Sequence, residues 1–372
     1  MTLPLPASAV LDERPFQHGS RLKVGVLLVN LGTPEAPTAP ALRKYLKEFL
    51  SDPRVVEIPK LVWWPLLNFI ILNTRPKKSA AKYASVWLEE GSPLRVYSER
   101  QLHKTAQALK DAGYDLEMEL AMRYGEPSIS QGIEALKARG VNRLLVLPLY
   151  PQFSASTTAT VFDKVYDALA AMRSPPALRT IRHYHDHPAY IHAVASSIRR
   201  HWAEKGRGDL LLMSFHGVPK RSLLKGDPYH CECHKTGRLI ASALGLAESE
   251  WRLSFQSRFG PAEWLKPYTA ELFEQLPLAG VKRLDVVCPG FLSDCLETLE
   301  EIAMEGKEEF LEAGGTQYQF IPCLNDSQEV VDLLKVLIEQ ETLGWPVRPE
   351  DASQAADRLV ARERALQIGA SD

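Results

Sequence analysis

The chain contains few of the features that mark membrane or secreted proteins. No apolar run reaches the roughly 18–20 residues that a membrane-spanning helix needs, and the nearest one, 61–72 (LVWWPLLNFIIL), is interrupted by Pro65 and Asn68. The first 15 residues lack a basic segment and carry prolines in their apolar part, unlike a secretory signal. Only five cysteines occur, and only two of them lie close together, so we expect reduced thiols and a cytoplasmic protein.

The chain also has no excess of charge of either sign. Its 44 basic and 46 acidic residues give a net charge of −2, so it lacks the basic excess that is typical of nucleic-acid-binding proteins. No GxGxxG motif follows the first apolar run, which argues against a dinucleotide-binding site. The length of 372 residues is enough for two domains of ordinary size.

Short apolar runs alternate with amphipathic stretches along most of the chain. The apolar runs predict strands at 24–30, 116–122, 144–149, 178–182, 210–215, 253–257 and 284–288. The amphipathic stretches predict helices at 41–49, 100–112, 128–138, 161–172 and 188–204. This alternation is typical of βαβ units, and we predict an α/β fold with doubly wound, mostly parallel sheets.

Three short motifs occur twice, in the same order. VNLGTP resembles SFHGVP, MRYG resembles SRFG, and GVNRLLVLP resembles GVKRLDVVCP with one inserted residue. A repeat of this kind predicts two similar Rossmann-like lobes with a central cleft. We place the first lobe at 22–175 and the second at 176–325. A C-terminal helix at 326–345 is expected to pack back on the lobes, and 346–372 to form a peripheral tail.

The repeat aligns two strand ends that differ in chemistry. In the second half the apolar run 210–215 ends on His216, followed by Gly-Val-Pro, and the equivalent residue of the first half is Leu31. Open α/β sheets bind ligands at the carboxyl ends of their strands, so we expect both residues to face the cleft. A histidine at a strand end is, on its own, more often structural than functional, so His216 needs support from other residues.

A row of carboxylates follows the predicted strand at 284–288. Asp294 or Ser293 can cap a helix that begins directly afterwards. Three glutamates recur every four residues on one face of this helix: Glu297, Glu301 and Glu305. They form either a solvated acidic face or a path for cations or protons. In the second interpretation Glu297 meets His216 as a metal-ligand or general-base pair.

Two histidine-rich tracts carry metal-ligand chemistry without the spacing of a common metal site. HCECH (His230–His234) lacks the second, distant ligand pair that structural zinc sites use. In HYHDHP (His183–Pro188), helix capping before Pro188 explains part of the pattern. We interpret both tracts as accessory or unrelated to the main site.

Other candidate groups stand at further strand ends. The hydroxyls of YPQFSASTTAT (Tyr150–Thr160) can bind an anionic group or cap the following helix. Arg123 follows another strand and Arg75 lies in the apolar part of the first lobe, and both suit a carboxylate ligand. The stretch 61–72 is expected to form a buried core helix or, alternatively, an exposed apolar lip that contacts a membrane or an apolar ligand.

Together these stretches resemble the ferrochelatases, enzymes that insert ferrous iron into a porphyrin. The resemblance rests on VNLGTPEAP, FLSDPRVVEIP, GSPL, AMRYGEPSI, PLYPQFSASTT, SFHGVP, GDPYHCECHKT, QSRFGPAEWLKP and PGFLSDCLETLEEI. It implies two Rossmann-like lobes around a porphyrin cleft. Ferrous iron and protoporphyrin IX would be the substrates, and protohaem the product, with two protons released.

Carried over to this sequence, the resemblance makes His216 and Glu297 the iron ligands, or makes His216 the acceptor of the pyrrole protons. It adds Glu301 and Asp294 as acidic residues beyond that pair, and places Leu31 on the opposite side of the porphyrin. The cleft-lining positions would be Tyr124, Ser154, Trp264 and Phe291, to which Arg75 and Arg123 add groups that bind carboxylates.

Two departures and two alternatives accompany this interpretation. Some relatives bind a [2Fe–2S] cluster through a cysteine in the YPQFS stretch and three in a C-terminal extension. This chain has Ala155 there and no cysteine after Cys323, so we expect no cluster. Cys295 stands where some relatives have a histidine, which leaves a proton role at that position in doubt.

The alternatives are a chelatase for coproporphyrin III or another metal or tetrapyrrole, and a non-catalytic porphyrin-binding protein.

Overall fold

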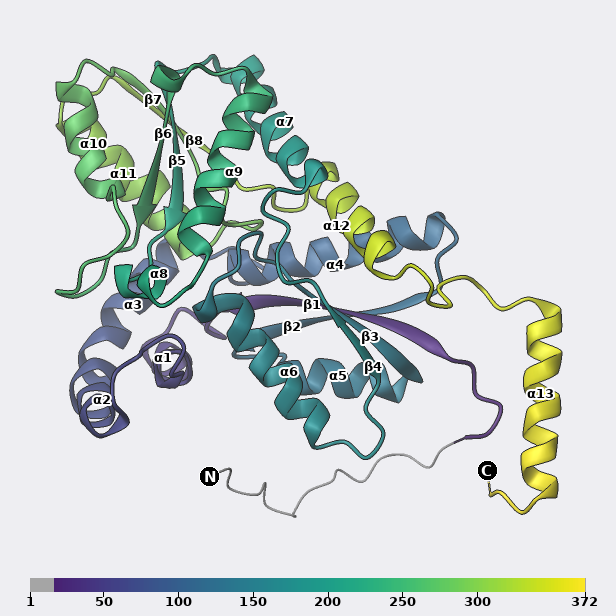
Figure 1. The fold of residues 1–372 in the computed structure, drawn as a ribbon. Coiled ribbons are helices and arrows are strands. Elements are labelled where there is room, and N and C mark those ends of the chain that lie inside the picture. Colours follow the sequence, from purple (N-terminus) through teal and green to yellow (C-terminus); the bar gives the residue numbers. More distant parts are fainter. Residues whose placement is uncertain (1–16, 372) are drawn as a thin grey trace.

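The computed structural model describes residues 17–371 and contains two four-stranded parallel sheets (Figure 1). The first has the order β2-β1-β3-β4, with β1 (Lys23–Gly32), β2 (Leu116–Tyr124), β3 (Val141–Pro148) and β4 (Ala177–Thr180). The second has the order β6-β5-β7-β8, with β5 (Leu210–His216), β6 (Trp251–Gln256), β7 (Arg283–Val287) and β8 (Gln317–Ile321). The first 15 residues, which we compared with a secretory signal, lie outside the described residues.

The two sheets repeat one topology. In each, the first strand along the chain pairs with the second on one side and with the third on the other. This confirms the α/β class and the two similar halves that the repeated motifs predict. The strand order reverses at β1 and at β5, and open sheets bind ligands in the crevice beside such a reversal.

Helices cover both faces of each sheet. Those of the first half are α1 (Ala39–Ser51), α2 (Lys60–Pro65), the π-helix η1 (Leu66–Ile71), α3 (Leu72–Val86), α4 (Pro93–Asp111), α5 (Ile129–Ala138), the π-helix η2 (Ala155–Ala159) and α6 (Thr160–Ala170). The second half contains α7 (Pro188–Lys205), α8 (Lys220–Leu224), α9 (Tyr229–Leu244), the 3₁₀ turn η3 (Glu248–Glu250), α10 (Thr269–Leu278), the π-helix η4 (Glu297–Glu305) and α11 (Gly306–Glu312). Two C-terminal helices follow, α12 (Gln328–Glu341) and α13 (Ala352–Gln367).

One apolar core runs through both halves. It includes Leu28 of β1, Leu109 of α4, Met213 of β5 and Leu334 of α12. Two smaller cores lie on the other faces of the sheets, under α5 and α6 and under α10 and α11. Because parallel strands are covered on both faces, they are expected to be apolar throughout, and residues 24–30 of β1 are all buried.

The halves divide slightly later than the motifs predict. We placed the division at 175/176, but β4 at Ala177–Thr180 is hydrogen-bonded to β3 and completes the first sheet. The α12 helix packs against α4 and α7, one from each half. No residue of α13 is buried, and Figure 1 shows this helix standing away from the sheets.

Most of the apolar stretch 61–72 is exposed, unlike the buried core helix that we favoured, and only Leu67 and Leu72 within it are buried. Leu61 is 92% exposed, Trp64 58% and Phe69 66%. Trp64 and Phe69 pack edge to face, with ring centroids 5.7 Å apart, while Trp63 donates from Nε1 to the Leu50 carbonyl at 2.6 Å. Hydrophobic periodicity could not distinguish a buried helix from an exposed one here, because an apolar helix that projects from the body has the same sequence pattern as a buried one. None of the described helices is both long and apolar enough to cross a bilayer.

The backbone turns sharply after β1 and after β5, and glycine is required at both turns. A Cβ on Gly32 would lie 1.8 Å from the Tyr124 carbonyl oxygen, and a Cβ on Gly217 would lie 2.6 Å from that of Gln256. Gly32 also has a φ of 111°, which L side chains rarely adopt. The residues that precede these glycines, Leu31 and His216, therefore occupy equivalent strand ends.

Candidate active site

His216 is the last residue of β5 and is partly accessible at the carboxyl edge of the second sheet. Its Nδ1 lies 2.6 Å from the Gly217 carbonyl oxygen. A carbonyl can only accept a hydrogen bond, so in the neutral ring Nδ1 carries the proton and Nε2 keeps a free lone pair. The imidazole is thus oriented to accept a proton or to bind a metal ion through Nε2.

The Glu301 carboxylate lies close to this imidazole and is held by Ser257. The backbone N–H of Ser257 donates to Oε1 at 2.6 Å, and its hydroxyl donates to Oε2 at 2.5 Å. Burial raises the pKa of Glu301 above its ordinary value, while the Ser257 hydrogen bonds and the charge of His216 oppose that rise and the charge of Glu297 adds to it. Glu301 can therefore take up a proton closer to neutral pH than an exposed glutamate.

Glu297 opens the π-helix η4 and faces the first half of the chain. Its backbone carbonyl accepts a hydrogen bond from Gln256 Nε2 at 2.9 Å. Burial raises the pKa of Tyr45 and of Tyr83, and the negative charge of Glu297 adds to the rise in both. These tyrosines come from α1 and α3, so Glu297 lies where the two halves meet.

The predicted α-helix after β7 begins instead as a π-helix. Its i→i+5 hydrogen bonds widen the turn, a feature that is frequent at functional sites. In the predicted carboxylate row Glu301 interacts electrostatically with His216, whose charge lowers its pKa, and with Glu297, whose charge raises it. Glu305, the third member, is exposed and pairs with Lys82 of α3 at 2.7 Å.

Aromatic rings line the same edge. The ring centroid of Phe291 lies 6.4 Å from that of His216. Trp264 packs on the backbone beside His216, because a Cβ on Gly217 would meet its ring at 3.1 Å. The indole Nε1 of Trp264 is buried without a hydrogen-bond partner. The structure therefore brings these two predicted residues to the site of His216.

Leu31 and Arg75 are contributed by the first half. Leu31 is partly buried at the end of β1, where its N–H donates to Asn30 Oδ1 at 2.8 Å. The Arg75 guanidinium lies 3.8 Å from the centroid of the Phe259 ring, which belongs to the second half. Burial lowers the pKa of Arg75. This arginine, which we predicted to bind a porphyrin, thus connects the two halves through its contact with Phe259.

Asp294 has a structural environment that differs from the one we expected. Its side chain is buried, and Oδ1 accepts from Thr298 Oγ1 at 2.9 Å and from the Cys323 backbone N–H at 3.3 Å. Oδ2 accepts from Asn325 Nδ2 at 2.7 Å. Both carboxylate oxygens are therefore used to join the start of η4 to the loop after β8.

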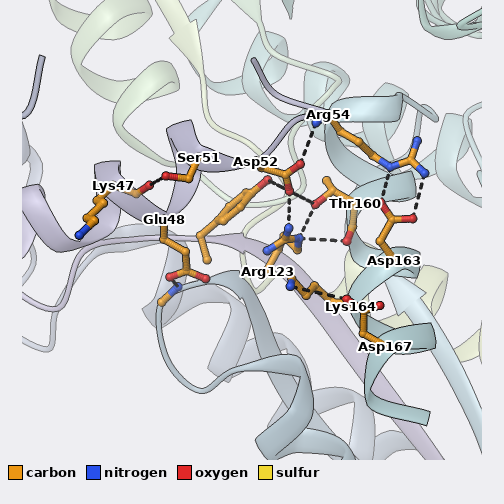
Figure 2. Close-up of polar contacts among 12 residues, drawn as sticks. Lys47, Glu48, Ser51, Asp52, Arg54, Arg123, Thr160, Asp163, Lys164 and Asp167 are labelled. Carbon is orange, nitrogen blue, oxygen red and sulfur yellow. Dashed lines mark hydrogen bonds and ion pairs between the residues drawn. The ribbon is translucent and has the colours of Figure 1, made fainter. Parts of the chain in front are cut away.

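Arg123 and Tyr124 are likewise buried, and both are bonded to Asp52. Figure 2 shows Arg123 beside Asp52 and Thr160. The Arg123 guanidinium pairs with Asp52 and also donates to the Thr160 carbonyl at 2.9 Å. The Tyr124 hydroxyl donates to Asp52 Oδ2 at 3.0 Å. We expected a free guanidinium and a ring that line the cleft. In this structure both side chains instead fix the end of β2 to α1 and α6, because a buried arginine needs a counter-ion.

Asp52 is the centre of this network. Burial alone would raise the pKa of its carboxyl group. Hydrogen bonds from Thr160 and from the Arg54 backbone, together with the charge of Arg123, outweigh burial and bring the pKa below its usual range. Asp52 is therefore ionised at neutral pH and compensates the buried charge of Arg123.

Ser154 is also buried, at the start of η2. Its hydroxyl donates to Asp227 Oδ2 at 3.1 Å and accepts a hydrogen bond from the Ser156 N–H at 3.4 Å. The bond from Ser156 matches the helix-capping interpretation of the Tyr150–Thr160 stretch, and the bond to the Asp227 carboxylate matches the alternative of a hydroxyl that binds an anionic group. Together they use the hydroxyl that we expected to line the cleft.

Sequence reasoning missed four residues of this region, namely Gln256, Ser257, Tyr45 and Tyr83. Gln256 and Ser257 directly follow the core of β6, so the strand-end rule that selected His216 could have selected them as well. The two tyrosines come from helices far away in the sequence, and no local pattern connects them with Glu297.

The solved structures that match this fold include chelatases. SirB from Bacillus subtilis, with Fe3+, matches with a TM-score of 0.51 at 12% identity, over 87% of this chain and 96% of that one. At this identity the match shows the fold alone, which is the two-lobed chelatase fold.

The sequence comparisons are more specific. The model of the ferrochelatase family matches residues 23–342. The ferrochelatase of Dechloromonas aromatica (strain RCB) is 56% identical over 341 residues, 91% of this chain and 93% of the relative. That of Azoarcus sp. (strain BH72) is 54% identical over 362 residues, 97% and 98% of the two chains. The chain therefore belongs to the ferrochelatase family, whose members are lyases that take a metal ion and a porphyrin as substrates.

Replacing Asp52 tests the buried network. Asp52→Asn leaves the Arg123 guanidinium buried without a counter-ion, so we expect the free energy of unfolding at pH 7 to fall by about 3–5 kcal/mol. Because the folded-state pKa of Asp52 is lowered, its stabilisation is present above the unfolded pKa and is lost as the pH falls through the folded value. The difference from wild type should thus shrink below about pH 4. Urea denaturation at several pH values measures both effects.

Asp163→Asn is the matched control, because Asp163 pairs with Arg54 at an exposed position. This variant should change the free energy of unfolding by less than about 1 kcal/mol. An equal loss in the two variants, or a difference between Asp52→Asn and wild type that persists in acid, would contradict the assignment.

Proposed function

We propose that this chain inserts ferrous iron into protoporphyrin IX, forming protohaem and releasing two protons. The observation that carries the proposal is His216 at the carboxyl edge of the second sheet with its Nε2 free, together with the Ser257-bound carboxylate of Glu301, which interacts electrostatically with both His216 and Glu297. Imidazole and carboxylate are ligands that Fe²⁺ accepts. They also accept protons, and metal insertion must remove two of these from the pyrrole nitrogens.

In the proposed reaction His216 takes a pyrrole proton at Nε2, since Nδ1 is bonded to the Gly217 carbonyl. Glu301 can then receive a proton from the imidazole, because burial raises its pKa while Ser257 keeps its oxygens in place. Glu297 serves as a metal ligand on the same face. A flat porphyrin hides its nitrogen lone pairs, so the site should favour a bent ring, with Leu31 on the side opposite His216.

The test of this function is anaerobic insertion of Fe²⁺, with protoporphyrin IX and coproporphyrin III compared as substrates. Wild type should turn over protoporphyrin IX faster, as followed by the porphyrin absorbance. His216→Ala and Glu297→Gln should lower kcat by roughly 10²–10⁴-fold and still quench porphyrin fluorescence on binding.

Three results would contradict the proposal. Faster turnover of coproporphyrin III would identify a different substrate, and preferential insertion of Co²⁺ or Ni²⁺ a different metal. Porphyrin binding without turnover in the wild type would identify a binding protein. The absence of a [2Fe–2S] cluster stays a prediction, and an iron–sulfur absorption band in the purified protein would refute it.

Ser257 gives the proton path a separate test. Ser257→Ala removes the hydroxyl that stabilises the Glu301 carboxylate, so the pKa of Glu301 should rise further. Insertion should then fall by about tenfold at acidic pH and stay near wild type at alkaline pH, since a hydrogen bond to a charged group is worth about 1.5–3 kcal/mol. The pH profile of kcat measures the shift.

Two control variants separate this effect from backbone strain. Ser257 has a φ of 63°, so Ser257→Gly relieves strain while removing the same hydroxyl, and it should give the same profile as Ser257→Ala. Ser156→Ala should leave the profile unchanged. A uniform loss at every pH would show that Ser257 acts only on the fold.

We further propose that the exposed surface formed by 61–72, the apolar lip, contacts the inner face of a membrane peripherally. Its supporting observation is the exposure of adjacent large apolar side chains on α2 and η1. Such patches mark interaction sites on soluble domains, and interfacial aromatic residues are typical of membrane contact. A cytoplasmic location fits this proposal, and no nucleic-acid partner is expected.

Sedimentation with vesicles of phosphatidylcholine and phosphatidylglycerol tests the lip. Wild type should bind, and Leu61→Ser/Phe69→Ser should bind at least tenfold more weakly, because burying each side chain is worth about 1.5–3 kcal/mol. Leu278→Ser is the control, since Leu278 is 82% exposed, between Phe69 and Leu61, but lies on α10. No binding by wild type, or an equal loss in the control, would exclude membrane contact through this surface.

A further inference from the structure

The two tracts that we set aside in the sequence meet in the fold: His183–Pro188 contributes two histidines, and His230–His234 contributes its buried glutamate, Glu232. His183 and His185 lie in the connection between β4 and α7, and Glu232 lies in the first turn of α9. One ligand atom from each of the three side chains lies within 4.8 Å of the others. Among residues 17–371 this is the one such group of three histidine, cysteine or carboxylate ligands.

The glutamate is held in place by the protein. Its Oε1 lies 2.7 Å from His183 Nδ1, and its Oε2 accepts a hydrogen bond from the Phe153 backbone N–H at 2.7 Å. His185 is fixed through its backbone carbonyl, which accepts from Thr236 Oγ1 at 2.8 Å. Metal ligands in proteins are commonly oriented by such outer hydrogen bonds.

His185 provides an independent indication of a missing ligand. This residue is only 5% exposed, and its Nδ1 is buried without a hydrogen-bond partner. Glu232 Oε2 lies 3.3 Å from that nitrogen, but without the geometry of a hydrogen bond. Buried polar atoms are nearly always satisfied in native proteins, and a cation between the two groups would satisfy this one.

The donor set selects the class of ion. Two imidazoles and one carboxylate suit first-row divalent transition metals such as Zn²⁺, Fe²⁺ or Co²⁺, and suit Mg²⁺ or Ca²⁺ poorly. Three protein ligands leave a fourth position for water. The His183 side chain is 38% exposed and supplies a route to solvent.

The competing explanation is an ion pair between His183 and Glu232 with no metal. Arg182 favours it, because its Nη1 lies 3.9 Å from Glu232 Oε1 and its guanidinium stacks on Phe153 at 4.1 Å. The Arg182 side chain is half exposed and can turn toward solvent. The ion pair between His183 and Glu232 leaves His185 Nδ1 without a hydrogen-bond partner. The orphaned nitrogen therefore favours the metal.

We propose that His183, His185 and Glu232 bind a divalent first-row transition metal ion, separately from the candidate active site. The hydrogen bonds and ion pairs described above for this triad do not involve His216, Glu297 or Glu301. The ion would join the β4–α7 connection to α9 and, through the Phe153 N–H, to the loop before η2. This inference does not rest on the proposed porphyrin reaction.

The experiment uses the full chain, stripped of metal by a chelator and titrated with Zn²⁺ or Co²⁺ in the absence of porphyrin. A background of His216→Ala/Glu297→Gln removes the candidate active-site ligands. In this background we expect one ion per chain by calorimetry, with visible Co²⁺ absorption bands and a raised Tm. Adding His183→Ala should weaken binding at least tenfold, since the loss of even an outer-shell partner costs 10–100-fold.

His183→Ala is the decisive variant, because the residue is partly exposed and its loss should leave the fold intact, which circular dichroism checks. Glu232→Gln provides a second ligand variant and should lose the ion to a similar degree. His187→Ala is the matched control from the same tract, because His187 Nε2 faces Gln340 outside the triad. The proposal is overturned if the background binds no ion, or if His183→Ala binds as tightly as the His187→Ala control.

Discussion

A carboxylate that is largely removed from water needs hydrogen-bond donors, and Glu301 finds two of them on Ser257. This contact fixes the first turns of η4 against the end of β6. Glu297, one turn earlier, is thereby placed between the second sheet and the helices of the first half. The site thus depends on Ser257, which stabilises the negative charge of Glu301. The His216 Nε2 atom is left free, because Nδ1 is the atom bonded to the Gly217 carbonyl.

The two halves show how one topology supports different tasks. In both halves the first strand leads into a glycine at which a Cβ would clash with the backbone of the neighbouring strand, and both halves carry an arginine followed by an aromatic residue at or just past the end of their second strand. In the first half Arg123 and Tyr124 are bonded to Asp52 in a buried network. In the second half the corresponding strand end presents Ser257 to Glu301. The arginine at this position is thus part of a buried ion pair in the first half, whereas the equivalent strand end of the second half holds the Glu301 carboxylate at the candidate site.

Much of the fold follows from the sequence, because its signals are local. The predicted strand at 24–30 lies within β1, the predicted helix at 188–204 nearly matches α7, and the repeated motifs correspond to repeated sheet topology. The family resemblance is confirmed by the sequence comparisons. The general rule that strand ends of a parallel sheet share one edge also predicts the position of His216 beside Phe291, while its pairing with Glu297 stays a proposal.

The features that the sequence did not predict depend on long-range contacts or on the difference between π-helical and α-helical turns. Asp52 and Arg123 are separated by 71 positions, so no local pattern shows that the arginine is neutralised and buried. The π-helical turns of η1 and η4 have no apolar periodicity that distinguishes them clearly from α-helix. Glu232 lies 49 positions after His183, and only the folded chain brings their side chains together.

The continuous core through both halves has a mechanical consequence. Domains that close on a ligand like a hinge have separate cores joined by short linkers. Here the apolar packing of β1 continues through α4 and α12 to β5, so a rigid-body rotation of one half would break a single close-packed interior. Adjustment to a large planar ligand must therefore come from the parts outside that interior, such as the lip, the strand-end loops and the wide turns of η4. The shared core therefore stays fixed, and only these peripheral segments move.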